Sequence, residues 1–181
     1  MKEIIIIFTS FFILRLTSLY ISVTNEKRLK KSGAVQYGKL NSALLTMAHI
    51  AYYASCLYEA YVSQASFNAY SKWGVFMMLF SYIVLFYVIY KLKNIWTLKV
   101  YIAPNHQIDN SFLFRTIKHP NYFLNIIPEL IGVSLLCNAW KTLLFGLPAY
   151  GVLLAIRIIQ EEKAMQNISF TSTPKDRTDR A

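Results

Sequence analysis

The sequence has few charged residues and few of the residues that interrupt regular structure. Only 15% of its 181 residues are charged, and it has 6 glycines, 5 prolines and 2 cysteines. A soluble domain usually carries about 25% charged residues, so this chain has too few to cover a water-facing surface. Because 55% of the residues are hydrophobic and 15% aromatic, a disordered chain, a collagen-like repeat and a disulfide-linked secreted scaffold are also excluded.

Several common catalytic motifs are absent as well. The sequence contains no G-x-S-x-G, no H-E-x-x-H, no phosphate-binding P-loop and no G-x-G-x-x-G. This disfavours the common hydrolases, zinc enzymes, nucleotide hydrolases and dinucleotide-dependent dehydrogenases. Cys56 and Cys137 fall in apolar stretches without metal-ligand spacing, so we expect buried thiols and no metal site.

The apolar residues gather in five stretches separated by polar, basic segments. The stretches are approximately residues 4–23, 43–62, 75–90, 122–137 and 143–159. A helix needs about 20 residues, and at least about 17, to cross a bilayer core about 30 Å thick. The first two stretches meet that length and the other three are slightly short. The first is followed by T-N-E-K-R rather than by a cleavage site of small residues, which indicates a retained span rather than a signal peptide.

We therefore predict an all-α integral membrane protein with about five transmembrane helices, a C-terminal helical hairpin and a cytoplasmic catalytic loop. Fifteen of the nineteen Lys and Arg residues lie after the first, third and fifth stretches, and only three lie on the other side. The positive-inside rule then places the N-terminus outside and the C-terminus in the cytoplasm, at the cell membrane if the protein is bacterial. Basic loops beside spans explain the net charge of +10 by attraction to anionic membrane lipids, so we expect no nucleic-acid partner.

Polar residues at the membrane edge are candidates for function because they are costly there. Pro120 is typical of the first position of a helix, whose free N–H groups attract an anion such as a carboxylate. We expect Tyr122 and Asn125 to lie on the first turn of that helix, on the face nearest the anion. Taken alone, His119 before this proline is also compatible with an ordinary loop or capping role.

A second polar cluster follows the fifth stretch. Arg157 and Glu161 are four residues apart and so share one helix face, although such a pair is often only a surface ion pair. The last two stretches are joined by residues 138–142, which predicts an antiparallel hairpin. The hairpin brings His119 and Tyr122 to the same membrane face as Arg157 and Glu161.

Two further polar residues lie inside the apolar stretches. Glu129, beside Pro128 in the fourth stretch, is expected to face a cavity or to pair with a neighbour, with a structural role as compatible as a substrate role. His49 in the second stretch is expected to make a hydrogen bond between helices.

The chain contains R-T-I-K-H-P-N-Y at residues 115–122, then the predicted hairpin, and then R-x-x-x-E-E at residues 157–162. This order of motifs resembles the isoprenylcysteine carboxyl methyltransferase family. The signature of that family is Arg-His-Pro-x-Tyr, a helical hairpin and Arg-x-x-x-Glu-Glu, and the resemblance covers roughly residues 94–165. The stretch N-E-K-R-L-K-K-S-G-A-V-Q-Y-G (25–38) is similar to a short bacterial branch that includes alkylpyrone and alkylresorcinol O-methyltransferases. Lys118 departs from the usual arginine, and the aromatic-rich helix of eukaryotic members is missing, which weighs against a prenylcysteine substrate.

The resemblance implies an O-methyltransferase that uses S-adenosylmethionine at the cytoplasmic face. His119, Tyr122 and Glu161 match cofactor-binding positions of the family motif. His106 and Phe114 fall where the family's loop covers the cofactor. The implied acceptor is a lipophilic small molecule or lipid-modified group that carries a carboxylate, or the phenol or enol of a polyketide-like lipid.

Arg157 and His119 are the predicted catalytic residues. Arg157 matches the family's substrate arginine and would hold an anionic oxygen of the acceptor. A carboxylate acceptor needs no base, whereas a phenol or enol must lose a proton, for which His119 or Glu161 is the available group.

We divide the chain into a three-span membrane region (1–92), a methyltransferase region (93–168) and a disordered tail (169–181). Two other classes of function stay open. A non-catalytic membrane scaffold or transporter subunit predicts no cofactor binding, and a membrane reductase of sterol or fatty-acyl substrates predicts a nicotinamide cofactor. The sequence does not specify the oligomeric state.

Overall fold

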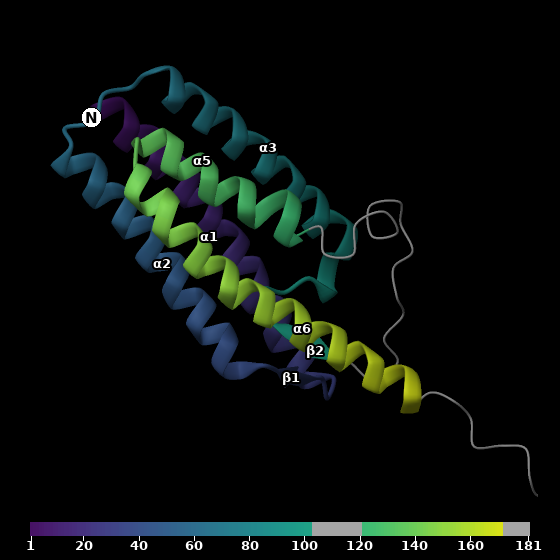
Figure 1. The fold of residues 1–181 in the computed structure, drawn as a ribbon. Helices are drawn as coiled ribbons and strands as arrows, with labels where there is room; N and C mark the ends of the chain where they lie inside the picture. Colours follow the sequence, from purple (N-terminus) through teal and green to yellow (C-terminus); the bar gives the residue numbers. More distant parts are fainter. Residues whose placement is uncertain (103–120, 172–181) are drawn as a thin grey trace, which may run out of the picture.

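The computed structural model describes residues 1–102 and 121–171 of the chain. In the described part, long helices run back and forth along one bundle (Figure 1). They are α1 (Lys2–Lys31), α2 (Lys39–Val62), α3 (Ala69–Leu92), α5 (Ile127–Cys137) and α6 (Leu147–Thr171). The π-helical turns η2 (Asn121–Ile126) and η3 (Thr142–Gly146) lead directly into α5 and α6. Each predicted apolar stretch falls within one of these helical segments, so the prediction of an all-α membrane protein is confirmed.

Three of the helices are long and apolar enough to cross a membrane. They span Lys2–Lys31, Ala69–Ile95 and Thr142–Lys163, and Asn121–Cys137 is a shorter apolar helix. Large apolar side chains such as Ile6, Ile83 and Phe145 are exposed on the outside of the bundle, where membrane lipid rather than water suits them. The chain is therefore a multi-pass membrane protein, while the number of five spans stays a prediction.

Two glycines allow α3 and α5 to approach closely. A methyl group added at Gly74 would lie 2.4 Å from the backbone nitrogen of Leu136 and 2.6 Å from the carbonyl oxygen of Gly132. Small residues of this kind let helix backbones pack directly against each other inside a membrane. The surrounding core includes the fully buried side chains of Met78 and Val133.

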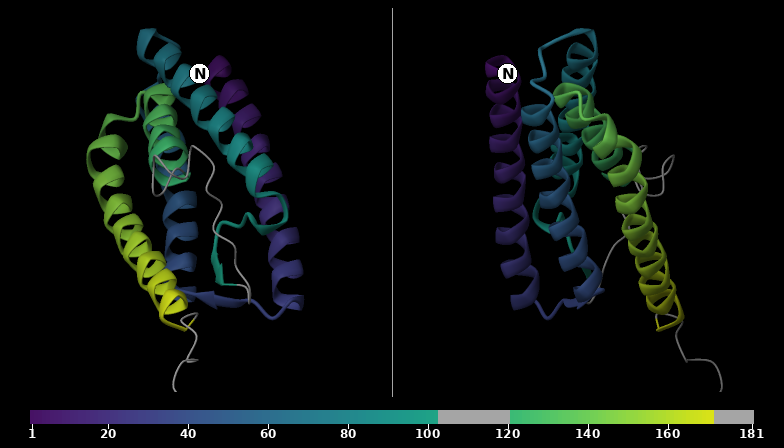
Figure 2. Two further views of the ribbon diagram at one scale, coloured as in Figure 1. Left: turned by 90° about the vertical axis from the view of Figure 1, so that its right-hand side faces the viewer. Right: turned by 60° about the vertical axis from the view of Figure 1, so that its left-hand side comes forward.

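A short antiparallel ribbon closes one end of the bundle, which we call the ribbon end (Figures 1 and 2). It pairs β1 (Val35–Tyr37) with β2 (Val100–Ile102), and Gln36 lies opposite Tyr101. The N-terminus lies at the other end of the bundle. We did not predict this ribbon from the sequence, because three-residue strands carry too little periodicity to be detected.

The segment that leads from α3 to β2 is fastened to the last turns of α1. It begins with the short 3-10 helix η1 (Lys93–Ile95). The side-chain amide of Asn25 donates to the carbonyl oxygens of Lys93 and Trp96, both at 2.8 Å, and the hydroxyl of Ser22 accepts from the backbone nitrogen of Leu98 at 2.9 Å. These bonds fix the segment across the ribbon end of the bundle.

The predicted hairpin is present, but its two helices separate. α5 ends at Cys137 and η3 begins at Thr142, so the connection is as short as expected. From there α5 packs mainly on α3 and α6 packs mainly on α2, and the two helices diverge toward the ribbon end (Figure 2). α6 continues to Thr171 and so includes the first residues of the predicted tail (169–181). Residues 172–181 lie outside the described part, so the division of the chain stays a prediction.

Candidate active site

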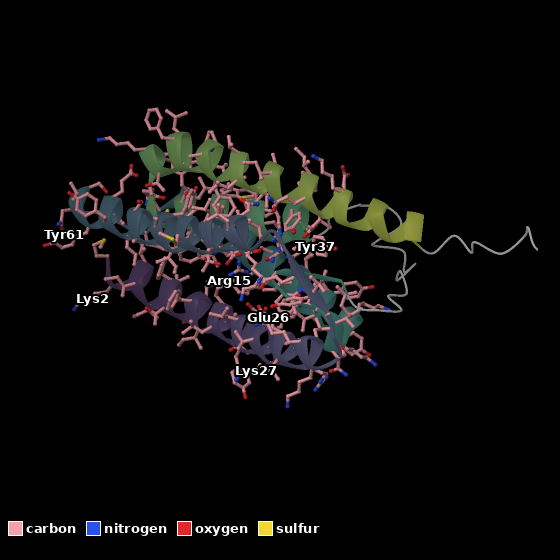
Figure 3. The ribbon with its side chains drawn as sticks, turned by 90° about the horizontal axis from the view of Figure 1, so that it is seen from below. Lys2, Arg15, Glu26, Lys27, Tyr37 and Tyr61 are labelled. Atoms are coloured by element: carbon pink, nitrogen blue, oxygen red, sulfur yellow. The ribbon has the colours of Figure 1, made fainter. Side chains whose placement is uncertain are left out.

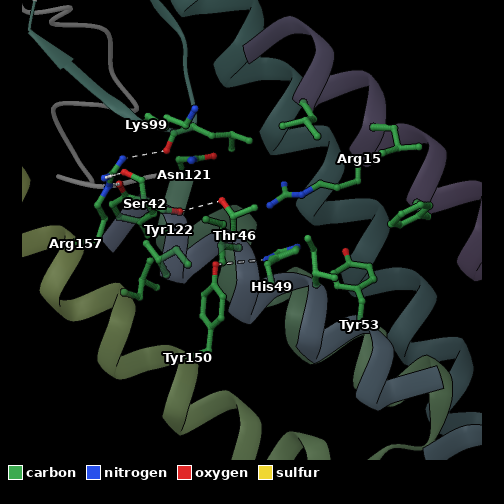
Figure 4. Close-up of a pocket in the computed structure, with 18 of the residues that line it drawn as sticks. Arg15, Ser42, Thr46, His49, Tyr53, Lys99, Asn121, Tyr122, Tyr150 and Arg157 are labelled. Atoms are coloured by element: carbon green, nitrogen blue, oxygen red, sulfur yellow. Dashed lines mark hydrogen bonds between the residues drawn. The ribbon is translucent and has the colours of Figure 1, made fainter. Parts of the chain in front are cut away.

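Arg157 projects from α6 into the bundle and is only 1% exposed (Figure 4). Its Nε donates to the hydroxyl of Tyr122 at 3.4 Å and lies 3.4 Å from Oε1 of Glu161. Nη1 donates to the hydroxyl of Ser42 at 2.8 Å, and Nη2 donates to the carbonyl oxygen of Leu98 at 3.1 Å. The planar guanidinium thus joins α2, the segment after α3, η2 and α6 at one point.

The predicted convergence of the two polar clusters is confirmed for three residues. The hydroxyl of Tyr122 donates to Oε1 of Glu161, and both side chains contact Arg157. Tyr122 is buried, whereas the Glu161 side chain is 21% exposed. We call these three residues the Tyr122–Arg157–Glu161 corner. Their roles in binding and catalysis stay predictions.

The other predicted site residues lie outside the described part of the chain. These are His106, Phe114 and His119. Pro120, the predicted first residue of the helix, lies there as well, so the anion site expected at that helix start also stays a prediction.

Asn125 does not share a face with Tyr122, and that prediction was wrong. Asn125 is fully buried toward α3, where the hydroxyl of Ser81 donates to its backbone and side-chain oxygens, both at 2.9 Å. We assumed an α-helix, in which residues three apart lie on one face. The observed η2 is a π-helix, whose wider turn separates such residues and which often occurs at functional sites.

A cavity of about 630 Å³ extends from the corner between α1, α2 and α6. Its wall is largely apolar and includes Phe12, Leu16, Leu45, Ile50, Leu57 and Leu154. Phe12, Leu16 and Ile50 are also 41%, 48% and 65% exposed, so this wall reaches the outer surface of the helices. Such a cavity suits an apolar chain that arrives from the surrounding membrane.

The sequence reasoning missed several groups at the corner. The Leu98 carbonyl is a backbone group that no sequence motif reveals, and Ser42 carries no pattern of its own. Gly38 has a left-handed backbone with φ +60°, and a methyl group added there would lie 2.3 Å from Oε1 of Gln160 and 3.6 Å from Nη1 of Arg157. A glycine just before a predicted helix was the available signal for this close approach.

An ion pair also lines the cavity near the corner. Nζ of Lys99 lies 2.7 Å from Oε2 of Glu26, and both residues contribute to the wall. The Lys99 side chain is 38% exposed. The pair places charged groups where a polar head could enter, whereas the deeper wall is mainly apolar.

Deeper in the bundle, Glu129 pairs with neighbouring side chains, which confirms one of the two alternatives predicted for it. Its Oε2 lies 3.2 Å from Nη1 of Arg15, and its Oε1 accepts hydrogen bonds from Tyr53 at 2.5 Å and Tyr82 at 2.9 Å. Glu129 is fully buried. The contacts connect α1, α2, α3 and α5, and Figure 3 shows Arg15 among the side chains between the helices.

The helix–helix hydrogen bond predicted for His49 is also present. Nδ1 of His49 on α2 lies 3.4 Å from the hydroxyl of Tyr150 on α6. Cys56 and Cys137 are buried free thiols, as predicted. Among the described residues, no group of three or more His, Cys, Asp or Glu side chains could hold a metal ion.

Comparison with known families identifies the family of this chain. The sequence profile of the isoprenylcysteine carboxyl methyltransferase family matches residues 74–167. The chain belongs to this family. The match includes most of α3, the whole of η2, which carries Tyr122, and the part of α6 that carries Arg157 and Glu161. The protein is therefore a membrane methyltransferase, and the resemblance inferred from the sequence motifs is confirmed.

Two relatives cover almost the whole chain. An uncharacterized protein of Haemophilus influenzae is 53% identical over 163 residues, which are 90% of this chain and 95% of the relative. The uncharacterized protein YpbQ of Bacillus subtilis is 26% identical over 155 residues, 86% of this chain and 92% of the relative. No solved structure matches the chain.

Proposed function

We propose that this methyltransferase transfers a methyl group from S-adenosylmethionine to an oxygen of a lipophilic acceptor. The observation that carries the proposal is the position of the Tyr122–Arg157–Glu161 corner at one end of a largely apolar cavity. The acceptor oxygen belongs to a carboxylate, or to the phenol or enol of a polyketide-like lipid. Its apolar chain lies in the cavity.

The chemistry of the corner fits this cofactor. The carboxylate of Glu161 is oriented by Tyr122 and Arg157 yet remains partly exposed, so it can accept hydrogen bonds from ribose hydroxyls or from an ammonium group. The ring of Tyr122 is suited to contact with a cationic sulfur. When bound, S-adenosylmethionine supplies a methyl group activated by that positive charge. By analogy with the family motif, His119, His106 and Phe114 complete the cofactor site.

Arg157 is proposed to hold the anionic oxygen of the acceptor. It lines the cavity, and two of its partners, the Ser42 hydroxyl and the Leu98 carbonyl, are neutral. An anionic oxygen can displace a neutral partner because charge-assisted hydrogen bonds are stronger. Ser42 keeps a partner after such an exchange, since its hydroxyl also bonds the Gly38 carbonyl at 2.8 Å.

The chain would accelerate the reaction mainly by alignment and by exclusion of water. Methyl transfer to oxygen is an in-line displacement, for which a fixed approach of the reacting groups supplies much of the rate. The apolar wall beside Arg157 keeps water away from the reacting oxygen. A carboxylate needs no proton acceptor, whereas for a phenol or enol His119 remains the proposed base, with Glu161 the other available group.

We also propose that the ribbon end faces the cytoplasm and the N-terminus lies outside. The basic residues of the last turns of α1 and α3, which include Arg28, Lys30, Lys31 and Lys91, lie toward the ribbon end. This distribution agrees with the positive-inside rule. The corner then lies on the side of the membrane where the water-soluble cofactor is made.

Binding of radiolabelled S-adenosylmethionine to the detergent-solubilised protein tests the proposal, with a labelled nicotinamide nucleotide measured in parallel. We expect S-adenosylmethionine alone to bind. Glu161→Gln should weaken this binding about 10- to 100-fold, the effect of losing one hydrogen bond to a charged group. The control is Glu3→Gln, an exposed carboxylate in the first turn of α1, which should bind as the wild type does. Binding of the nicotinamide nucleotide, or no loss in Glu161→Gln, would contradict the proposal.

A further inference from the structure

Arg15 is an unusual residue for the middle of a membrane helix. A charged side chain at that depth is costly and marks a functional position by default. Its guanidinium points into the cavity (Figure 4), and the Arg15 side chain is only 13% exposed. Nη1 of Arg15 lies 3.2 Å from Oε2 of Glu129, which balances its charge, although the pair does not have the geometry of a hydrogen bond. No hydrogen bond joins the other two nitrogens of the guanidinium to a described residue.

This shortage of hydrogen-bond partners distinguishes the Arg15–Glu129 pair from an ion pair that only holds helices together. An arginine carries five N–H donors, and a structural arginine normally uses most of them. Arg157, the other arginine that lines the cavity, bonds through all three of its nitrogens. Arg15 therefore retains donors that the described protein does not use, and they face the cavity.

His49 presents a second such group from the opposite wall. Its Nδ1 lies within hydrogen-bond distance of the Tyr150 hydroxyl, while Nε2 is buried without a hydrogen-bond partner in the described part of the chain. The same Nε2 lies 4.0 Å from Oε1 of Glu129. Because Arg15 and His49 both approach Glu129, they lie at the same depth in the bundle.

We propose that Arg15 and His49 recognise a second oxygen of the acceptor, deep in the cavity, and that this oxygen is neutral, as in a ketone or an ester. The inference rests on the proposed function, since it assumes that the acceptor chain occupies the cavity. Arg15 and Glu129 already neutralise each other, so an added anion would leave one buried charge without compensation. A carbonyl oxygen instead accepts the N–H groups of Arg15 and His49 without adding charge.

The fold sets the distance between the two oxygens. Ser42 contacts Arg157 at the corner, and His49 lies seven residues further along α2. At 1.5 Å per residue, this separation is about 10 Å along the helix axis. The preferred acceptor therefore carries its neutral oxygen about 10 Å from the oxygen that is methylated, and a plain saturated chain lacks the group that Arg15 and His49 bind.

The test compares two probes that differ only in the proposed group. One is a saturated straight-chain fatty acid, and the other is the same acid with one keto group about 10 Å from the carboxylate. Equilibrium binding of each acid to the purified protein is measured directly, without S-adenosylmethionine. We expect the wild type to bind the keto acid at least about tenfold more tightly than the plain acid. In Arg15→Met this ratio should fall to about one.

A second variant protects the test against misfolding. Arg15→Met leaves Glu129 buried without its partner, whereas Arg15→Met/Glu129→Gln removes both charges and keeps an oxygen for Tyr53 and Tyr82. The ratio should also fall to about one in this double variant. A wild type that does not bind the keto acid or does not prefer it overturns the inference, and so does a preference that survives in the folded double variant.

The outcome is separable from that of the proposed function. If the wild type prefers the keto acid but binds no S-adenosylmethionine, the recognition site is supported and the proposed cofactor is wrong. If the wild type methylates both acids and binds them with equal affinity, the cofactor is supported and the recognition site is wrong.

Discussion

Arg157→Lys is the most informative single substitution because it keeps the charge and removes the planar fork. Arg157 contacts Tyr122, Glu161, Ser42 and the Leu98 carbonyl through three nitrogens that point in different directions. A lysine ammonium is one compact group. We expect it to follow the negative charge of Glu161 and to lose the bonds at 2.8 Å and 3.1 Å to Ser42 and Leu98.

The two lost bonds are not equally costly. Ser42 retains its bond to the Gly38 carbonyl, whereas no other hydrogen bond to the Leu98 carbonyl is present in the described part. A bond to a charged group contributes about 1.5–3 kcal/mol, and a buried unsatisfied acceptor costs about 1–3 kcal/mol. We therefore expect the free energy of unfolding to fall by about 2–4 kcal/mol in total. For a chain of this length the midpoint of thermal unfolding should fall by roughly 5–15 °C.

The assay follows tryptophan fluorescence during heating of the purified protein in detergent, because the buried Trp96 lies two residues from Leu98. A midpoint within about 2 °C of the wild type would refute the energetic role given to these bonds. In the same preparation, turnover should fall strongly while S-adenosylmethionine affinity changes little. Lost cofactor binding with normal turnover at saturation would instead assign Arg157 to the cofactor. Additive losses in Arg157→Lys/Glu161→Gln would show that the two residues act independently.

Two further predictions concern packing and topology. Gly74→Ala should destabilise the protein by about 1–3 kcal/mol because the new methyl group meets backbone atoms of α5. Gly151→Ala, where nothing lies within 4 Å, should stabilise α6 by about 0.5–1 kcal/mol; thermal midpoints that move in the same direction would contradict the close approach of α3 and α5. A reporter fused after Ala181 should be active only in a form that works in the cytoplasm, and activity of a periplasmic or luminal reporter there would reverse the proposed orientation.

The helices and most of the corner were predictable because their signals are local. Hydrophobic runs located the five helical segments, and a connection of a few residues forced the chain to turn back. The turn brings Tyr122 to the same end of the bundle as Arg157 and Glu161, although about forty residues separate the two clusters. No tertiary information was needed for that step.

The remaining parts depend on contacts between residues distant in the sequence. β1 and β2 are three residues each and pair across more than sixty positions, so neither strand shows a pattern of its own. The π-helical turn at Tyr122 gives Asn125 a different orientation from the one that an α-helix would give it. This was not predicted, because the sequence does not indicate where a helix widens. Arg15 was visible as a charge inside an apolar stretch, but its partner Glu129 lies on another helix and only the fold joins them.

The exposed wall of the cavity at Phe12, Leu16 and Ile50 has a consequence for which concentration of acceptor sets the rate of this enzyme. Under the proposed function, an acceptor dissolved in the bilayer would reach that wall by diffusion within the membrane plane, without passing through water. Turnover would then follow the mole fraction of acceptor in the membrane, and adding inert lipid at a constant molar amount of acceptor would slow the reaction. The dependence of the rate on S-adenosylmethionine would still be set by its aqueous concentration. One substrate would therefore be supplied from the two-dimensional membrane and the other from the three-dimensional aqueous solution.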